Sequence, residues 1–345
     1  MQTAKQIGAL GGALVLSAGL AASASAAEWN MKVGGYLNSG VIISSLNDDY
    51  QGTGVFSDGE IQFSPSIKLD NGITYGARVE IESFTTGDQI DEHYMYAKGG
   101  FGEIKIGAED AAHYNLHSQA PGAGFDNYAD NSYIATYGTL HTTDYASSDS
   151  NKVYYMSPSM NGLKIGLSYA PDTTTGGGMQ GGKATGNAKT AGSYGGAYAV
   201  GARYSGSFDG VSVHANLGFQ HLGLDSQETV ADQDREVIIG GVSAAMGGVK
   251  VGATFKTDDM GDANTENNVY SVGVTYSAGA MTIGAGTAAQ TTETSGVDSD
   301  VNTASASVAY KVGPGVTVGG GVQYEDNDTK ADDAFGVVMG VKLSF

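Results

Sequence analysis

Alternation of apolar and polar residues with a period of two is the feature that most constrains this chain. The residues from Val211 to Gln220 alternate in this way, as do those from Leu163 to Tyr169 and from Val249 to Lys256. Successive side chains of a β-strand point to opposite faces, so each run has one face toward an apolar medium and one toward water. The sequence therefore predicts an all-β fold built from amphipathic strands.

Short turn sequences separate many of these strands. Asn-Gly and Asp-Gly pairs supply the positive φ angles that tight hairpins need. Seven short turns occur, three of which contain such a pair, at residues 70–72, 99–102, 160–162, 208–210, 246–248, 278–280 and 313–315. They define seven hairpins, with one strand before them (Trp29 to Ser44) and one after them (Phe335 to Phe345). The prediction is sixteen antiparallel strands, joined at the other end by eight longer polar loops.

An even number of strands, with short turns at one end and long loops at the other, is typical of transmembrane β-barrels. A sheet in lipid must close on itself to pair its backbone, and sixteen strands enclose a water-filled interior. A soluble β-propeller or large β-sandwich is the alternative, because its core-facing strands also alternate. Outward aromatic residues favour the barrel, and we expect them where the loops begin: Tyr169, Phe219, Phe255, Tyr276, Tyr310 and Tyr324.

The first 26 residues have the pattern of a secretory signal peptide. Lys5 is their only charge, an apolar run from Ile7 to Ala22 follows, and Ala24-Ser25-Ala26 matches an A-x-A cleavage sequence. We therefore expect a signal peptide at residues 1–26 and a barrel domain at residues 27–345. Removing Lys5 leaves 16 basic residues against 37 acidic ones, a net charge of −21. This excess disfavours nucleic acid as a partner and favours cations.

Three segments carry a family resemblance. The residues from Phe335 to Phe345 end on an aromatic, like the terminal strand of outer-membrane proteins. Lys98 to Gly107 resembles the fourth strand, turn and fifth strand of the general diffusion porins of Gram-negative bacteria, and Asn151 to Gly162 resembles their sixth strand and third turn. The resemblance implies a homotrimeric, non-enzymatic channel in the outer membrane. Its partners would be small hydrophilic solutes, membrane lipid and lipopolysaccharide.

The resemblance also implies that the long third loop, Ala111 to Ser150, folds into the barrel lumen and narrows the pore. Its 40-residue length supports a functional role. The family places loop carboxylates opposite basic residues of the wall, which here implies Glu109, Asp110, Asp126 and Asp130 facing Lys68, Arg78 and Lys98. Glu109 stands where the family often carries an Arg. We therefore expect the channel to prefer cations.

The other long loops are also acidic. They are either solvated surface or loose sites for divalent cations such as calcium, which would bridge to lipopolysaccharide phosphates. The clusters are Asp225, Glu228, Asp232 and Asp234; Asp258, Asp259, Asp262 and Glu266; and Asp326, Asp328, Asp332 and Asp333.

No resident cofactor or metal is predicted. His113 and His117 have chelating spacing if they lie on a helix, but a third ligand is not evident. Gly176 to Lys183 resembles a phosphate-binding loop, but it lies in a Gly-rich loop where Ala184 replaces the required Ser or Thr.

Two other functions remain as alternatives. A sugar-specific porin would need aromatic residues along the lumen, for which Tyr94 and Tyr96 are candidates. An outer-membrane enzyme or adhesin would use the barrel as a scaffold.

Overall fold

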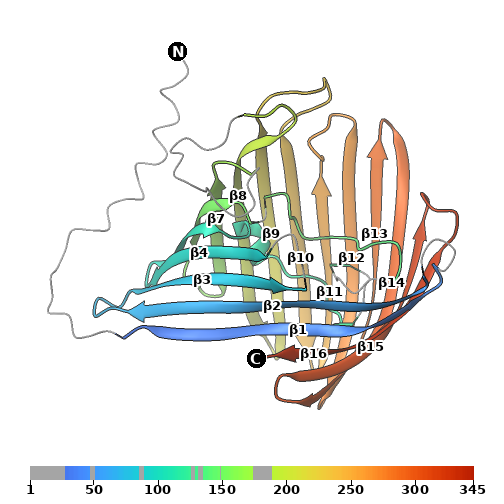
Figure 1. Cartoon of the computed structure of the whole chain (residues 1–345), viewed down its shortest axis with the longest axis horizontal. Helices are drawn as coiled ribbons and strands as arrows, with labels where there is room; N and C mark the ends of the chain where they lie inside the picture. The colour runs from blue at the N-terminus through green and yellow to red at the C-terminus, as the bar shows by residue number, and fades with distance from the viewer. Residues whose placement is uncertain are drawn as a thin grey trace.

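The computed structural model describes residues 28–46, 51–84, 89–125, 129–130, 135–147, 149–173 and 189–345. Sixteen antiparallel strands form one closed barrel, in which each strand pairs with its neighbours in sequence and β1 pairs with β16 (Figure 1). The strands are β1 (Asn30–Ser44), β2 (Thr53–Lys68), β3 (Thr74–Ser83), β4 (Ile90–Gly99), β5 (Gly102–Ala108), β6 (Asn151–Met156), β7 (Leu163–Ala170), β8 (Tyr194–Phe208), β9 (Val211–Leu224), β10 (Arg235–Met246), β11 (Val249–Asp258), β12 (Thr265–Ala278), β13 (Met281–Thr294), β14 (Val297–Gly313), β15 (Val316–Asn327) and β16 (Ala334–Ser344).

The predicted strand count and closed barrel are confirmed. Backbone hydrogen bonds between Gly35 and Phe345 join the first strand to the end of the last one, at 3.0 and 3.1 Å. The predicted signal peptide lies outside the described residues. No helix among those residues is long and apolar enough to cross a membrane. The one helix described is α1 (Ala112–Leu116).

The tight turns form where the sequence predicts them. Asn161 and Gly162 have φ angles of 51° and 93°, and Asp209 and Gly210 have φ angles of 48° and 83°. Two successive positive φ angles match the twist of the flanking strands, and Asn, Asp and Gly tolerate them best. Local sequence therefore fixes these hairpins.

The seventh of the predicted long loops is not a loop. β13 and β14 are joined by the two residues Ser295 and Gly296, whose φ angles are 54° and 78°. The polar residues on either side continue the ladder, with Thr291 opposite Asp300 and Glu293 opposite Asp298. Their polarity predicts a loop, but a strand that extends into water is polar on both faces.

Alternation along each strand separates an apolar outer face from a polar inner face. In β12, Val272 and Val274 are 56% and 43% exposed on the outside, whereas Ser271 and Thr275 are buried on the inside. The outer face is the one suited to lipid.

The expected position of the aromatic residues is wrong for two of them. Tyr276 and Tyr310 lie beside the short turns, opposite Val249 and Met281, rather than beside the loops. Tyr324 lies near the loop end of β15, opposite Phe335. The outward aromatics thus occur near both ends of the barrel, which is the arrangement of two interfacial girdles.

Candidate pore constriction

The residues between β5 and β6, 109–150, are called the inner segment below, and several of them contact the inner wall of the barrel. Phe125 is buried against Ala309 and Val338, and Leu140 is buried against Val269 and Ala288. These wall residues alternate with exposed outer ones such as Tyr270 and Val308, so they face the lumen. Small apolar clusters therefore attach the segment to a wall that is otherwise polar.

A buried hydrogen bond between two side chains links the two ends of the inner segment. His113 Nε2 lies 2.8 Å from Asp144 Oδ2, and both side chains are almost completely buried. Gln220 of β9 donates to the same carboxylate at 2.9 Å, and the Ala146 amide donates to its other oxygen at 2.8 Å. Burial acts to raise the pKa of Asp144, but the hydrogen bonds from His113 and from the Ala146 amide hold it below its usual value. Asp144 is therefore a stable anion that anchors α1.

Lys152, at the start of β6, holds the base of the segment. Its Nζ is buried and donates to the carbonyl oxygens of Glu109 at 2.5 Å, Ser150 at 3.1 Å and Ser147. Glu109 begins the segment and Ser150 ends it, so one ammonium group bridges both ends. Lys152 was not among the predicted site residues.

The two carboxylates at the base of the segment differ in environment. Glu109 accepts from Lys105 at 2.6 Å and from Asn115 at 2.9 Å, so its charge is compensated. Asp110 groups with Glu92 and Asp149, with carboxylate oxygens within 4.8 Å of one another. Burial, and then those two neighbours, raise the pKa of Asp110 to about 9. At neutral pH Asp110 is therefore protonated and adds no charge to the lumen.

Lys105, which donates to Glu109, also contacts two aromatic rings of the wall. Its Nζ lies 4.4 Å from the ring centre of Tyr94 and 5.0 Å from that of Tyr154, which are cation–π distances. Tyr94 faces the lumen as expected, but one of its ring faces is in contact with this ammonium.

A bulge in β4 adds carboxylates that the sequence does not reveal. Val79 pairs with His93 but Ile81 pairs with Ile90, so Glu80 lies opposite the two residues Asp91 and Glu92. Such a bulge re-aims side chains. Glu60, Glu80 and Asp91 consequently have carboxylate oxygens within 4.8 Å of one another.

Of the predicted wall cations, only Arg78 lies in this acidic region. Its Nε is bonded to Glu80. Lys68 and Lys98 both pair with Thr74 at the short-turn end, and Lys98 lies 3.2 Å from Glu103 with its side chain 65% exposed. The three predicted cations therefore do not form one cluster.

Of the two predicted acids in the middle of the segment, Asp126 lies outside the described residues. Asp130 accepts from the backbone amides of Thr142 at 2.8 Å and Thr143 at 3.1 Å, and both hydroxyls donate to it as well. Burial acts to raise the pKa of Asp130, but hydrogen bonds from His141 and these two residues hold it below its usual value. This carboxylate first of all connects the two halves of the segment.

Several acidic side chains of the external loops are already engaged, either within their own loop or with a neighbouring strand. Asp258 makes a bidentate ion pair with Arg235 at 2.8 and 2.6 Å, and Asp232 accepts the amide of Thr229 at 2.8 Å. Within the described parts of the chain, three carboxylates converge only at the two groups in the lumen wall given above. The two histidines of the chelating pattern bond to Asp144 and, for His117, to Asn216 at 3.0 Å. The Gly-rich residues 176–183 lie outside the described residues.

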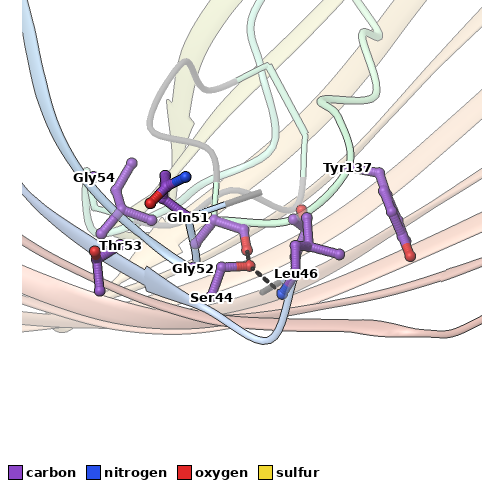
Figure 2. A pocket seen from close by; sticks show the side chains of 10 residues that line it. Ser44, Leu46, Gln51, Gly52, Thr53, Gly54 and Tyr137 are labelled. Atoms are coloured by element: carbon purple, nitrogen blue, oxygen red, sulfur yellow. Dashed lines mark hydrogen bonds between the residues drawn. The ribbon is translucent and has the colours of Figure 1, made fainter. Parts of the chain in front are cut away.

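An uncharged pocket of about 320 Å³ lies where the inner segment returns past β1 and β2 (Figure 2). Ser44 Oγ accepts the Leu46 amide at 3.2 Å and donates to the Ala135 carbonyl at 2.7 Å, which fixes the segment to the barrel rim. Thr53, Gly54 and Tyr137 complete part of its lining. The pocket offers polar contacts but no charge to a passing ion.

A closed sixteen-stranded barrel with an apolar exterior, a polar interior and a long segment fixed inside it is the architecture of an outer-membrane channel. The sequence model of the Gram-negative porin family matches residues 12–330. The chain belongs to that family, whose members are passive channels of the outer membrane rather than enzymes.

Solved structures of porins share the fold. The anion-selective porin from Comamonas acidovorans is 18% identical, with a TM-score of 0.67 over 92% of this chain and 100% of that one. A porin refined at 1.8 Å is 20% identical, with a TM-score of 0.63 over 92% and 100%. A loop L8 deletion mutant of OmpT, an outer membrane protein of Vibrio cholerae, is 16% identical, with a TM-score of 0.67 over 92% and 99%. At these identities the likeness concerns the fold alone. A comparison with curated proteins found no match.

Proposed function

We propose that this porin is a cation-preferring diffusion channel for small hydrophilic solutes. The observation that carries the proposal is the charge of the lumen wall between β2 and β4. There Arg78 is bonded to Glu80, which converges with two further carboxylates, so this one cation faces a group of three acids: Glu60, Glu80 and Asp91. Fixed charges lining a narrow passage select ions of the opposite sign. An anion-selective porin has the same fold, so the sign of the selectivity must come from the side chains.

The inner segment is proposed to narrow this passage. Its attachment by Phe125, by the His113–Asp144 pair and by Lys152 supports the proposal, because a fixed segment sets a reproducible width. Assembly as a homotrimer, export through the signal peptide at residues 1–26, and loose binding of divalent cations between the acidic loops and lipopolysaccharide belong to the same proposal.

Bilayer recording under a salt gradient tests the function. We expect stepwise channel insertion and a reversal potential of the sign for cations at 0.1 M salt. The preference should weaken at 1 M salt, because the screening length falls from about 10 Å to about 3 Å. A reversal potential of the sign for anions at 0.1 M would contradict the proposal.

A further inference from the structure

Glycines occupy the inner-wall positions on which the first half of the inner segment rests. Gly166, Gly201 and Gly218 pair across β7, β8 and β9 and form a flat patch under α1. A Cβ atom at each of them would lie close to Ala112 or His113. Further along the wall, an atom of the inner segment is among the three nearest to an added Cβ at seven more glycines, and atoms of the wall are among them too except at Gly336: Gly241, Gly252, Gly284, Gly319, Gly321, Gly336 and Gly340. We call these ten residues the glycine track.

The order of the contacts follows the order of the strands. Residues further along the inner segment lie close to glycines of strands further along the chain. The pairs, in order, are Ala112 with β7, His113 with β8 and β9, Ser118 with β10, Pro121 with β11, Ala123 with β13, Phe125 with β15 and β16, and Ala135 with β16. The segment therefore follows the wall from strand to strand, in contact with the track, over the residues that the structure describes.

The second half of the segment returns along the same wall. Gly138 donates to Glu325 of β15 at 3.1 Å, and Leu140 packs against β12 and β13. Thr142 accepts from Thr254 of β11 at 3.0 Å, and Asp144 accepts from Gln220 of β9 at 2.9 Å. Both halves are thus layered on the wall.

Three positions of the track show most clearly that the segment leaves no room for a side chain there. A Cβ at Gly201 would lie 2.8 Å from the Cα of His113, and a Cβ at Gly284 would lie 2.8 Å from the amide nitrogen of Ala123. At Gly336 it would meet the methyl group of Ala135 and lie 2.5 Å from its carbonyl oxygen. Real Cβ atoms essentially never approach closer than 3.0 Å, so something must move.

The inner segment must move rather than the wall. Each track strand is hydrogen-bonded to a neighbour on both sides, and the barrel is closed. A lateral shift of one strand would therefore break two ladders, whereas the segment can shift into the water-filled lumen. Any displacement in that direction reduces the space left for solutes.

We propose that the glycine track determines the width of the channel, by allowing the inner segment to lie flush against the wall. The track residues are positioning residues that touch no solute themselves. The proposal rests on the proposed function, since it presupposes an open channel that the segment narrows.

Single alanine substitutions in the full chain test it. Gly336→Ala is the most informative, because all three nearest atoms belong to Ala135, and Gly284→Ala is the second choice. Gly54→Ala is the matched control, since Gly54 lies on the inner side of β2 and a Cβ there meets nothing within 4 Å. We expect lower single-channel conductance, and exclusion of smaller neutral polyethylene glycols, for the two track variants but not for the control.

A compensating substitution makes the test decisive. Ala135→Gly removes the methyl group nearest to the new Cβ, so Gly336→Ala with Ala135→Gly should regain part of the lost conductance. If Gly336→Ala does not fold, the double variant is compared with it on a gel. Reappearance of the folded-barrel band, which shifts on heating, then shows that the clash with Ala135 has been relieved. A track variant with wild-type conductance and size limit, or a double variant no better than the single one, would overturn the proposal. A wild-type protein that forms no channel would instead overturn the proposed function.

Discussion

The pH dependence of the inner segment is set in part by His117. Burial, more than any charge, lowers the pKa of this side chain from 6.5 to about 4, and nearby His113 acts in the same direction. The attached segment therefore keeps His117 neutral, whereas a detached segment exposes it and lets it take up a proton. Attachment has its full stability above about pH 6.5 and loses it as the pH falls toward 4.

The size of this pH effect follows from the difference between the pKa of an exposed His117 and its pKa in the attached segment. A fall in the pKa from 6.5 to about 4 corresponds to roughly 3 kcal/mol of attachment free energy at full titration. At pH 5 the loss is about 2 kcal/mol, which is a roughly 30-fold change in the equilibrium between attached and detached segment. Asp144 and Asp130 do not contribute in this range, because their pKa values lie below the usual value for Asp.

Asp110 acts in the opposite direction. Its raised pKa, about 9, means that the attached state holds a proton that an exposed carboxylate would release, so attachment gains from Asp110 as the pH falls. Comparing the wild type with His117→Gln at each pH cancels this contribution, because both proteins retain Asp110. Gln also retains a group that can hydrogen-bond to Asn216.

Hydrogen exchange of the amides in residues 112–125, read by mass spectrometry on detergent-folded protein, measures detachment. Between pH 7.5 and 5, the ratio of the wild-type opening equilibrium to that of His117→Gln should rise by roughly 30-fold. Asp209→Asn, in a short turn far along the chain from the segment, should behave as wild type. A ratio that stays constant over this range would refute the reasoning.

Three further predictions follow from the wall and the anchors. Arg78→Ala should increase the cation preference, seen as a larger reversal potential in a salt gradient, because Glu60, Glu80 and Asp91 lose their cation; a shift toward anions would contradict it. Lys152→Met should loosen the base of the inner segment, because each buried hydrogen bond from a charged donor contributes about 1.5–3 kcal/mol. The loosening should be measurable as faster amide hydrogen exchange at residues 149–150 and as greater noise in the open-channel current. Detergent-folded protein should give a β-rich circular dichroism spectrum and a gel band that shifts on heating, and a helical spectrum would be incompatible with the barrel.

Local sequence was sufficient to predict the strands, since a hairpin such as Asn161-Gly162 depends on adjacent residues only. A run of polar residues can be either a loop or a strand that extends into water, and the sequence does not distinguish the two. The residues around Ser295 predict a loop but form such a strand. The wall acids could have been found in part, because Glu80 has the same parity as Arg78 in β3. The inward direction of Asp91 could not be predicted, because it depends on a bulge defined by the partner strand.

The anchors of the inner segment were the least predictable part of the site. His113 and Asp144 are 31 residues apart, and the described residues between them form no regular structure after α1, so no periodicity connects them. Asp130 was predicted as a pore charge from the family resemblance, and the hydrogen bonds that its carboxylate accepts from Thr142 and Thr143 could not be foreseen. Tertiary contacts of this kind have no signature in a single sequence.

The glycine track also determines when, during assembly, the channel can acquire its final width. The track ends on β16, and the Ala135 amide donates to Gln323 of β15 across a separation of 188 residues. The surface that receives the inner segment is therefore complete only after the last strand of the chain has joined the first. Until then, a chain inserting into the membrane lacks the part of the wall that Phe125 and Ala135 contact. These contacts therefore predict an order: the barrel closes before the inner segment completes its contacts with the wall.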